Sequence, residues 1–83
     1  MIHKLKILPK YFQKVLSEEK NFEIRKDRGF EVGDVIVLNE WTDDVKTYTG
    51  RSVVRVISYI SRDVPDYGLM SGFVVLSCKI QRS

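Results

Sequence analysis

The stretch Gly33-Asp34-Val35-Ile36-Val37-Leu38 places a turn signal directly before four consecutive apolar residues. An apolar run of this length without alternation is typical of a strand that is covered on both faces. Residues 51–60 predict a second long strand that also carries large apolar side chains on both faces. A small sheet cannot cover both faces of its strands while it stays open. We therefore expect these strands to close, or nearly close, into a barrel.

Outward from this stretch, the chain predicts one helix and further short strands. Residues 3–8 alternate charged and apolar side chains, as a half-buried strand does. Pro9 fits the first turn of a helix, and the apolar spacing behind it predicts a helix over residues 9–18. A strand follows in which Glu23 and Arg25 share one face.

The remaining segments complete the predicted architecture. The polar residues 42–50 predict a long hairpin loop, residues 61–72 a second loop, and residues 73–80 a last strand. The sequence therefore predicts a single α+β domain over residues 1–83, built as a small β-barrel of five or six strands with one N-terminal helix packed at its edge. An open sheet packed on the helix is the alternative.

Composition narrows the class of protein. The chain has 83 residues, of which 43% are hydrophobic and 30% are charged, which fits one small domain and is too apolar for a disordered tail. Cys78 and His3 are the only residues of their types, so we expect no intramolecular disulfide, no metal site and no cofactor. The single cysteine fits a reducing, cytoplasmic setting. The start of the chain has no long apolar run, so we expect neither a signal peptide nor a membrane partner, and we favour a monomer.

The charges are unevenly distributed along the chain. Residues 1–28 carry a net charge of +4, residues 29–50 a net charge of −4, and residues 51–83 a net charge of +3. If the two basic ends meet in the fold, they form one positive side that suits a nucleic-acid partner. A solvated surface of mixed charge is the alternative.

The candidate binding motif lies at the entry to the strand that contains Glu23. Lys20 precedes this strand, and Glu23 and Arg25 project from one of its faces. Arg offers a planar fork, Lys a mobile cation and Glu an acceptor for an exocyclic amine, so together they could hold a phosphate or the edge of a base. The alternative is a row of surface ion pairs, which would contribute little to stability.

Several motifs together resemble a known superfamily, and they cover nearly the whole chain. They are His3-Lys4-Leu5-Lys6, Pro9-x-Tyr11-Phe12, Lys20-x-x-Glu23-Ile24-Arg25-Lys26, Asp27-Arg28-x-Phe30-x-Val32-Gly33-Asp34, Tyr48-Thr49-Gly50-Arg51 and Gly68-Leu69-x-x-Gly72-x-Val74-Val75-Leu76. The chain resembles a small phage and bacterial branch, of unknown function, of the ASCH superfamily. ASCH domains are similar in fold to PUA RNA-binding domains.

This resemblance implies a PUA-like barrel with a cleft between helix and sheet that binds RNA or a nucleotide, single-stranded or modified. The superfamily's lysine, glutamate and arginine signature maps onto Lys20, Glu23 and Arg25. The pattern departs at Glu18, where many relatives have glycine. A left-handed backbone there would disfavour glutamate, and the carboxylate adds a negative charge beside the anion site.

The resemblance also raises an enzymatic alternative. Some small bacterial ASCH proteins are amidohydrolases on acetylated cytidine that use a lysine, a threonine three residues later and a distal glutamate. Lys20 matches the lysine, but Glu23 stands at the threonine position, and no Glu follows Glu40. If the domain is an enzyme, Lys20 and Glu23 are its candidate catalytic residues, although the neighbouring cations favour an ionised carboxylate rather than a general base.

Other residues have secondary roles in this interpretation. Lys6 and Lys26 are candidates for backbone contacts, and Arg28 is a candidate for a contact or a turn brace. Base stacking or cleft lining is assigned to His3, Trp41 and Tyr67, with a core role as the alternative for His3. Cys78 is expected in the core rather than as a nucleophile. A protein-interaction module of phage origin, using the acidic residues Asp43 and Asp44, is a further alternative function.

Overall fold

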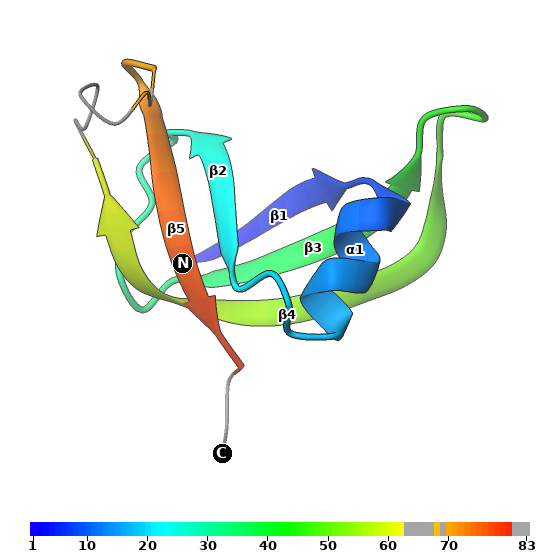
Figure 1. The fold of residues 1–83 in the computed structure, drawn as a ribbon, viewed down its shortest axis with the longest axis horizontal. Helices are drawn as coiled ribbons and strands as arrows, with labels where there is room; N and C mark the ends of the chain where they lie inside the picture. The colour runs from blue at the N-terminus through cyan, green and yellow to red at the C-terminus, as the bar shows by residue number, and fades with distance from the viewer. Residues whose placement is uncertain (63–67, 69, 81–83) are drawn as a thin grey trace.

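The long apolar strands form the centre of a five-stranded sheet in the computed structural model, which describes residues 1–62, 68 and 70–80 (Figure 1). One short helix lies against this sheet. In chain order the elements are β1 (Ile2–Ile7), α1 (Pro9–Leu16), β2 (Phe22–Lys26), β3 (Val35–Thr42), β4 (Thr47–Ser61) and β5 (Phe73–Lys79).

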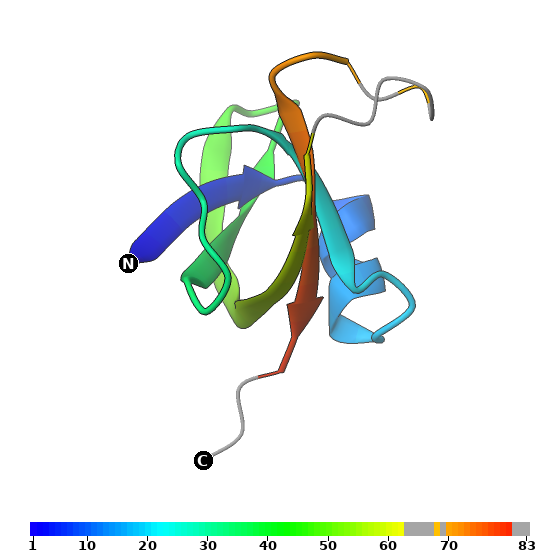
Figure 2. The same ribbon diagram turned by 90° about the vertical axis from the view of Figure 1, so that its left-hand side faces the viewer.

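The strands follow the order β1-β3-β4-β5-β2 in a strongly curled sheet (Figure 2). β1 runs parallel to β3, and the other neighbouring strands are antiparallel. The α+β class, with five strands and one short helix, is therefore as predicted. The sheet is a half-barrel rather than a closed barrel, because β1 and β2 each pair with a single neighbour.

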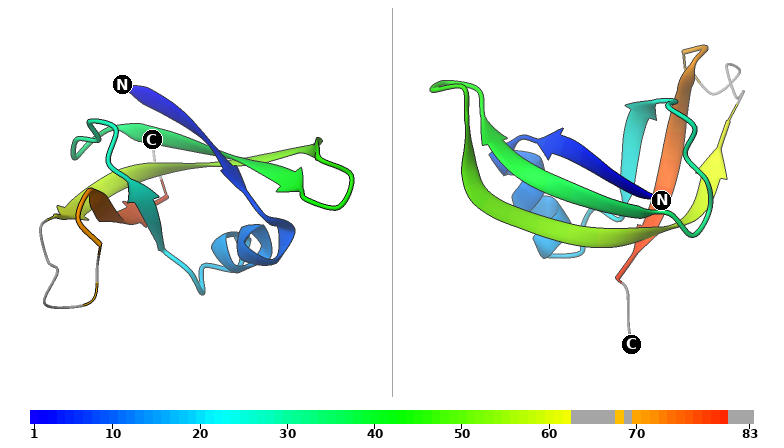
Figure 3. Two further views of the ribbon diagram at one scale, coloured as in Figure 1. Left: turned by 90° about the horizontal axis from the view of Figure 1, so that it is seen from above. Right: turned by 180° about the vertical axis from the view of Figure 1, so that it is seen from behind.

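The curl is concentrated in β4, which bends along its fifteen residues (Figure 3). Its first part pairs with β3 up to Val56, and its last part pairs with β5. The register shifts between Ile57 and Tyr59, and a bulge of this kind bends a strand and increases its twist. One strand can therefore belong to both halves of the sheet.

The β3–β4 hairpin is longer than the sequence predicted. Trp41 pairs with Tyr48 and Thr42 with Thr47, so the loop between the strands consists only of residues 43–46. Residues 42–50 contain several polar side chains, but cross-strand pairing extends the ladder into them. The hairpin becomes a two-stranded arm at one end of the molecule (Figure 1).

The core lies on the concave side of the sheet and beneath α1. The helix contributes Phe12 and Val15, both almost fully buried, and packs against β3. The other buried apolar residues are Leu5, Ile7, Phe30, Ile36, Leu38, Val53, Ile57, Val74 and Leu76. The helix ends at Leu16 rather than at residue 18, because Glu18 adopts a left-handed backbone with φ of 63°.

Residues 27–34 form a turn that is anchored at several points. Phe30 is fully buried, and Asp34 accepts a hydrogen bond from the Glu31 amide at 3.1 Å. Arg62 donates to Asp27 at 3.0 Å and also to the Phe30 carbonyl. Arg62 therefore braces this turn, a role for which the sequence analysis considered Arg28.

Candidate functional site

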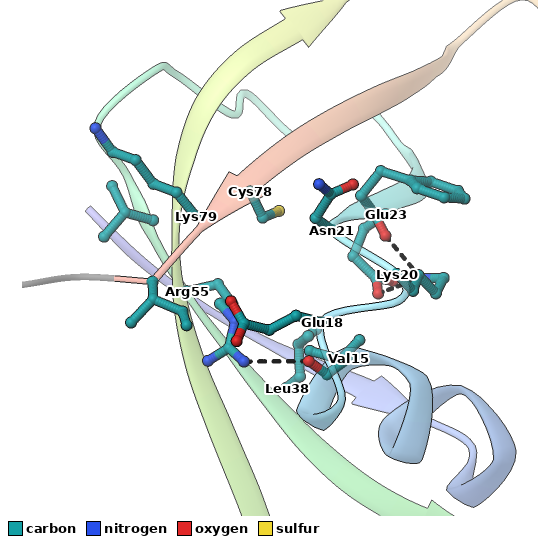
Figure 4. A pocket seen from close by; sticks show the side chains of 12 residues that line it. Val15, Glu18, Lys20, Asn21, Glu23, Leu38, Arg55, Cys78 and Lys79 are labelled. Atoms are coloured by element: carbon teal, nitrogen blue, oxygen red, sulfur yellow. Dashed lines mark hydrogen bonds and ion pairs between the residues drawn. The ribbon is translucent and has the colours of Figure 1, made fainter.

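A pocket lies between the C-terminal end of α1 and the sheet, where the predicted cleft was expected. This main pocket has a volume of about 650 Å³. Figure 4 shows its lining, in which side chains from the helix end, the start of β2, β4 and β5 face one another. The lining residues are Val15, Glu18, Lys20, Asn21, Phe22, Glu23, Leu38, Arg55, Val56, Cys78, Lys79 and Ile80.

Three predicted site residues meet at one carboxylate. Lys20 Nζ donates to Glu23 Oε1 at 2.5 Å, and Arg25 donates to Glu23 Oε2 through Nε at 3.1 Å and Nη2 at 2.9 Å. Lys20 Nζ also donates to the Phe22 carbonyl at 2.7 Å. We call Lys20, Glu23 and Arg25 the Glu23 cluster. The sequence analysis expected these residues to converge, and the structure brings them into direct contact.

The orientation of β2 explains why this carboxylate is buried. Glu23 is only 4% exposed, whereas the apolar Phe22 and Ile24 are 41% and 53% exposed. In the β2–β5 ladder Glu23 lies opposite Leu76, which is fully buried. Directly paired residues share one face of an antiparallel sheet, so Glu23 points toward the core side. The charged face of β2 is therefore its inner face.

Arg55 adds a cation to the main pocket that the sequence analysis did not select. Its Nη2 donates to the Val15 carbonyl at the end of α1 at 3.2 Å (Figure 4). A cation at this end of a helix is favourable because the last carbonyls lack intrahelical partners. The sequence signal was present: Arg55 lies at period-2 spacing between Val53 and Ile57, which both face the core.

A side pocket of about 480 Å³ adjoins the main pocket. Lys20, Phe22 and Glu23 line both pockets. The remaining residues of the side pocket are Lys6, Ile7, Leu8, Tyr11, Ile24 and Arg25. Arg25 Nη2 donates to the Lys6 carbonyl at 2.8 Å, so this side chain bridges the two edge strands β1 and β2 where their ladder is open.

Comparison with known proteins shows the family to which the sequence belongs. A family model described as "Domain of unknown function (DUF3850)" matches residues 2–78. The chain belongs to the DUF3850 family. It is also 42% identical over 67 residues to an uncharacterized 12.9 kDa protein in the GpA 3′ region of Escherichia phage P2. The match covers 80% of this chain and 59% of the phage protein, so the DUF3850 domain described here spans under two thirds of that relative.

Cys78 lines the main pocket of the DUF3850 domain but has the properties of a packing residue. It packs against the core, and its Sγ donates to the Leu76 carbonyl at 3.5 Å. Burial raises the pKa of the Cys78 thiol to about 11, and the negative charge of Glu23 raises it further. A thiol with this pKa is protonated at neutral pH, which disfavours a nucleophilic role.

The structure places His3 in the core, away from both pockets. His3 is 5% exposed, its Nε2 lies 2.8 Å from Asp34 Oδ2, and its ring lies 4.6 Å from that of Phe30. Asp34 has a lowered pKa of about 2, caused first by the His3 hydrogen bond and then by the amino terminus of Met1. This geometry agrees with the core interpretation of His3, and no cleft-lining contact accompanies it.

The other predicted residues are dispersed. Lys6 lines the side pocket, whereas Lys26 and Arg28 are exposed at the end of β2 and in the turn after it, outside both pocket linings. Trp41 lies on the β3–β4 hairpin beneath Lys6. Tyr67 lies outside the described residues.

Glu40 is a buried carboxylate that the sequence analysis did not select as a site residue. Glu40 is 4% exposed and accepts hydrogen bonds from Thr49 Oγ1 at 2.6 Å and from Arg51 Nε and Nη2, each at 3.0 Å. These contacts lower the pKa of the Glu40 carboxyl, the Arg51 hydrogen bonds contributing most. We call Glu40, Thr49 and Arg51 the Glu40 cluster. The sequence did indicate that Glu40 faces the core, because it follows the buried residues Ile36 and Leu38 at every second position along the strand.

Two further properties bear on the chemistry of the domain. Within residues 1–62, 68 and 70–80, no three His, Cys, Asp or Glu side chains gather in a way that could hold a metal ion. Among the same described residues, no helix is long and apolar enough to span a membrane.

Proposed function

We propose that this DUF3850 domain binds RNA or a nucleotide, with a single-stranded or modified base in the main pocket. The observation that carries the proposal is the pocket between α1 and the sheet, which combines the buried carboxylate of Glu23 with the cations of Lys20 and Arg55. These groups converge at one concave site rather than being spread over a surface.

The size and walls of the main pocket suit a planar base. Its volume of about 650 Å³ falls in the range typical of small-molecule sites. Val15, Leu38 and Val56 provide apolar wall, and Asn21 and Glu23 provide polar groups at the end of the pocket near β2. Apolar walls with a few convergent polar groups are the usual composition of a ligand site.

The hydrogen bonds of Glu23 leave capacity for a ligand. Oε1 accepts one hydrogen bond, from Lys20, and a carboxylate oxygen has lone pairs for two. An exocyclic amine or ring N–H of a base can therefore donate to Oε1 while the cluster remains intact. Such a contact would distinguish bases by their donor edges.

The cations around the pocket suit the phosphate of the same ligand. Lys79 and Arg55 come from β5 and β4, and Lys20 comes from the entry to β2. They face Glu18 and Glu23, so the lining carries a small net positive charge. Cations positioned in this way bind phosphate and make the affinity dependent on salt.

The resemblance to ASCH domains supports the same proposal. Their PUA-like fold places a ligand cleft between a helix and a curled sheet, and the matching lysine, glutamate and arginine form the Glu23 cluster here. The amidohydrolase alternative would need Glu23 or Lys20 to act on a substrate, and both are engaged with each other. The test below therefore distinguishes binding alone from turnover of modified nucleosides.

The test is a titration of the purified domain with mononucleotides and with short single-stranded and duplex RNA and DNA at low and raised salt. We expect salt-sensitive binding of single-stranded RNA or nucleotide, weakened in Lys20→Ala. Lys46→Ala is the matched control, because Lys46 lies in the β3–β4 loop, outside both pocket linings. Binding that is equal in both variants, or no binding at any salt, would overturn the proposal. Release of product from a nucleoside panel would favour the enzyme.

A further inference from the structure

The side pocket has no ligand in the proposed function, although its composition is that of a binding site. Its volume of about 480 Å³ lies in the range of small-molecule sites. The apolar residues in its lining are Ile7, Leu8, Tyr11, Phe22 and Ile24. All of these except Ile7 are exposed. Exposed apolar side chains that gather around one hollow are typical of a surface that a ligand covers.

The side pocket adjoins the main pocket through side chains that the two share. Lys20, Phe22 and Glu23 line both pockets, whereas Tyr11 lines only the side pocket of the two. Lys20 Nζ lies 2.5 Å from Glu23 Oε1 and 5.9 Å from the ring centre of Tyr11. The ammonium group therefore stands at the boundary, and a ligand atom that contacts it is beside both pockets.

Lys20 retains capacity for an anion at this boundary. An ammonium group has three N–H donors, and within the described part of the chain two of them are used, for Glu23 Oε1 and for the Phe22 carbonyl. The Lys20 side chain is 18% exposed, so ligand atoms can reach it. Arg25 shares the same carboxylate, which leaves the Glu23 cluster with one excess positive charge. The third donor of Lys20 can therefore bind a phosphate oxygen.

The side pocket also offers aromatic rings that are close to cations. Tyr11 is 44% exposed and Phe22 is 41% exposed. Lys20 Nζ lies 5.0 Å from the ring centre of Phe22, and Lys10 Nζ lies 4.9 Å from that of Tyr11. Exposed rings interleaved with cations are the pattern with which proteins bind single strands, because bases stack on the rings while the cations meet the phosphates.

We infer that the side pocket holds the second base of a dinucleotide unit whose first base occupies the main pocket, with the phosphate between the two bases at Lys20 Nζ. This inference rests on the proposed function and narrows its ligand class to a dinucleotide or a longer single strand. The second base stacks on Tyr11. The exposed Lys10 side chain gives way to it, because a cation contributes less at an exposed ring than a stacked base does.

Dinucleotides that lack one base test this inference at constant phosphate charge. Calorimetry compares a single-stranded dinucleotide with its two abasic forms, one for each position, at the same salt concentration. We expect each abasic form to bind the domain at least about tenfold more weakly than the complete dinucleotide, since each lacks one of two bound bases. If either abasic form bound as tightly as the complete dinucleotide, only one base would be recognised, and the side pocket would not be a second base site.

Variants of Tyr11 locate the second base. Tyr11→Ala should weaken dinucleotide binding by about tenfold and leave mononucleotide binding unchanged, because one stacking surface is lost. Tyr11→Phe keeps the ring and should retain most of the affinity, which excludes a folding defect as the cause. Tyr59→Ala is the matched control, since Tyr59 is an exposed tyrosine on β4 outside both pocket linings. Equal dinucleotide affinities in Tyr11→Ala and Tyr59→Ala would overturn the inference.

The failure of this inference differs from the failure of the proposed function. Binding of mononucleotides that depends on Lys20, together with dinucleotide binding that does not depend on Tyr11, contradicts only the second base site. Absence of binding of either ligand to the parent domain contradicts the proposed function and this inference with it.

Discussion

The Glu23 cluster and the Glu40 cluster use the same chemistry in two different settings. In each, a glutamate that is 4% exposed accepts three hydrogen bonds from neighbouring side chains, including two from an arginine. Lys20 and Glu23 line both pockets described above, whereas no member of the Glu40 cluster lines either of these two pockets. A buried ion cluster is therefore not a site by itself. It becomes a candidate when the surrounding elements leave space for a ligand beside it.

The partners of the two glutamates also differ in exposure. The side chains of Lys20 and Arg25 are 18% and 24% exposed, whereas that of Arg51 is 49% exposed. Arg51 also rests on Phe12, with its guanidinium carbon 4.7 Å from the ring centre. Arg51 can therefore turn toward water if its partner is lost, and the two cations of Glu23 have less freedom to do so.

The largest expected effect on stability comes from Glu23→Ala. Removal of this carboxylate leaves two partly buried cations without their partner, which should lower the free energy of unfolding by about 2 kcal/mol. Glu40→Ala should cost less, because Arg51 is more exposed. Chemical denaturation of both variants measures the difference. If Glu40→Ala lowered the free energy of unfolding more than Glu23→Ala does, the exposure of the partner cations would not explain the difference between the two clusters.

The next effect concerns binding and separates the clusters by function. Lys20→Ala should weaken nucleotide or RNA binding by about tenfold. It should also reduce, by about one, the slope of the logarithm of the binding constant against the logarithm of salt concentration. Arg51→Ala removes a cation from the Glu40 cluster and should leave the affinity unchanged. Isothermal titration at two or more salt concentrations gives both quantities. Equal losses in the two variants would mean that long-range charge, rather than the pocket, determines the affinity.

A smaller effect is expected at the two non-glycine residues with left-handed backbones. Glu18 has φ of 63° at the main pocket, and Lys46 has φ of 51° in the hairpin loop. Glycine avoids the steric cost of this conformation, so Glu18→Gly and Lys46→Gly should each stabilise the domain by about 0.5 to 1 kcal/mol.

Only Glu18→Gly should also change binding. This substitution removes a carboxylate from the lining of the main pocket and should strengthen binding of an anionic ligand. Lys46→Gly serves as the backbone control, since Lys46 lies outside both pocket linings. Thermal denaturation and titration on the same samples test both parts, and a gain in affinity in the Lys46 variant would contradict the assignment.

The smallest effect is a dependence of stability on pH. The pKa of Glu40 is lowered below 4.5 in the folded state by Arg51 and Thr49. Ionised Glu40 therefore stabilises the folded state fully at pH values above the pKa that Glu40 has in the unfolded chain. This stabilisation is lost as the pH falls through the lower pKa that Glu40 has in the folded state. Glu40→Gln should make the fall in melting temperature on acidification below about pH 4.5 shallower. If the fall in melting temperature at acidic pH were the same in Glu40→Gln as in the parent, protonation of Asp34, which has a pKa of about 2, would account for the acid dependence instead.

The sequence predicted the strands, the helix and the convergence of Lys20, Glu23 and Arg25, because these follow from local periodicity. It could not say which face of β2 points inward. Alternation fixes only that Glu23 and Arg25 share a face, and the exposed positions of Phe22 and Ile24 depend on pairing with β5. Tertiary pairing thus decides whether the charged face lines a pocket or a surface.

Glu40 and Arg55 were missed for a different reason. Each is a charged residue in a largely apolar stretch of strand, at a position that alternation assigns to the core side. Local pattern marks such a residue as unusual, but its partners are distant in sequence: Arg55 reaches Val15, and Glu40 reaches Arg51 across a hairpin. The extent of that hairpin was underestimated because the pairing of Trp41 with Tyr48 is not visible in composition.

The open edges of the half-barrel have a consequence for assembly. β1 and β2 each leave one row of backbone groups outside the ladder, and such edges can template pairing with another chain. Lys4 on β1 and Lys26 on β2 are exposed there, and like charges oppose the approach of a second copy. A polyanion that neutralised these lysines would lower this repulsion and favour pairing of the exposed edges.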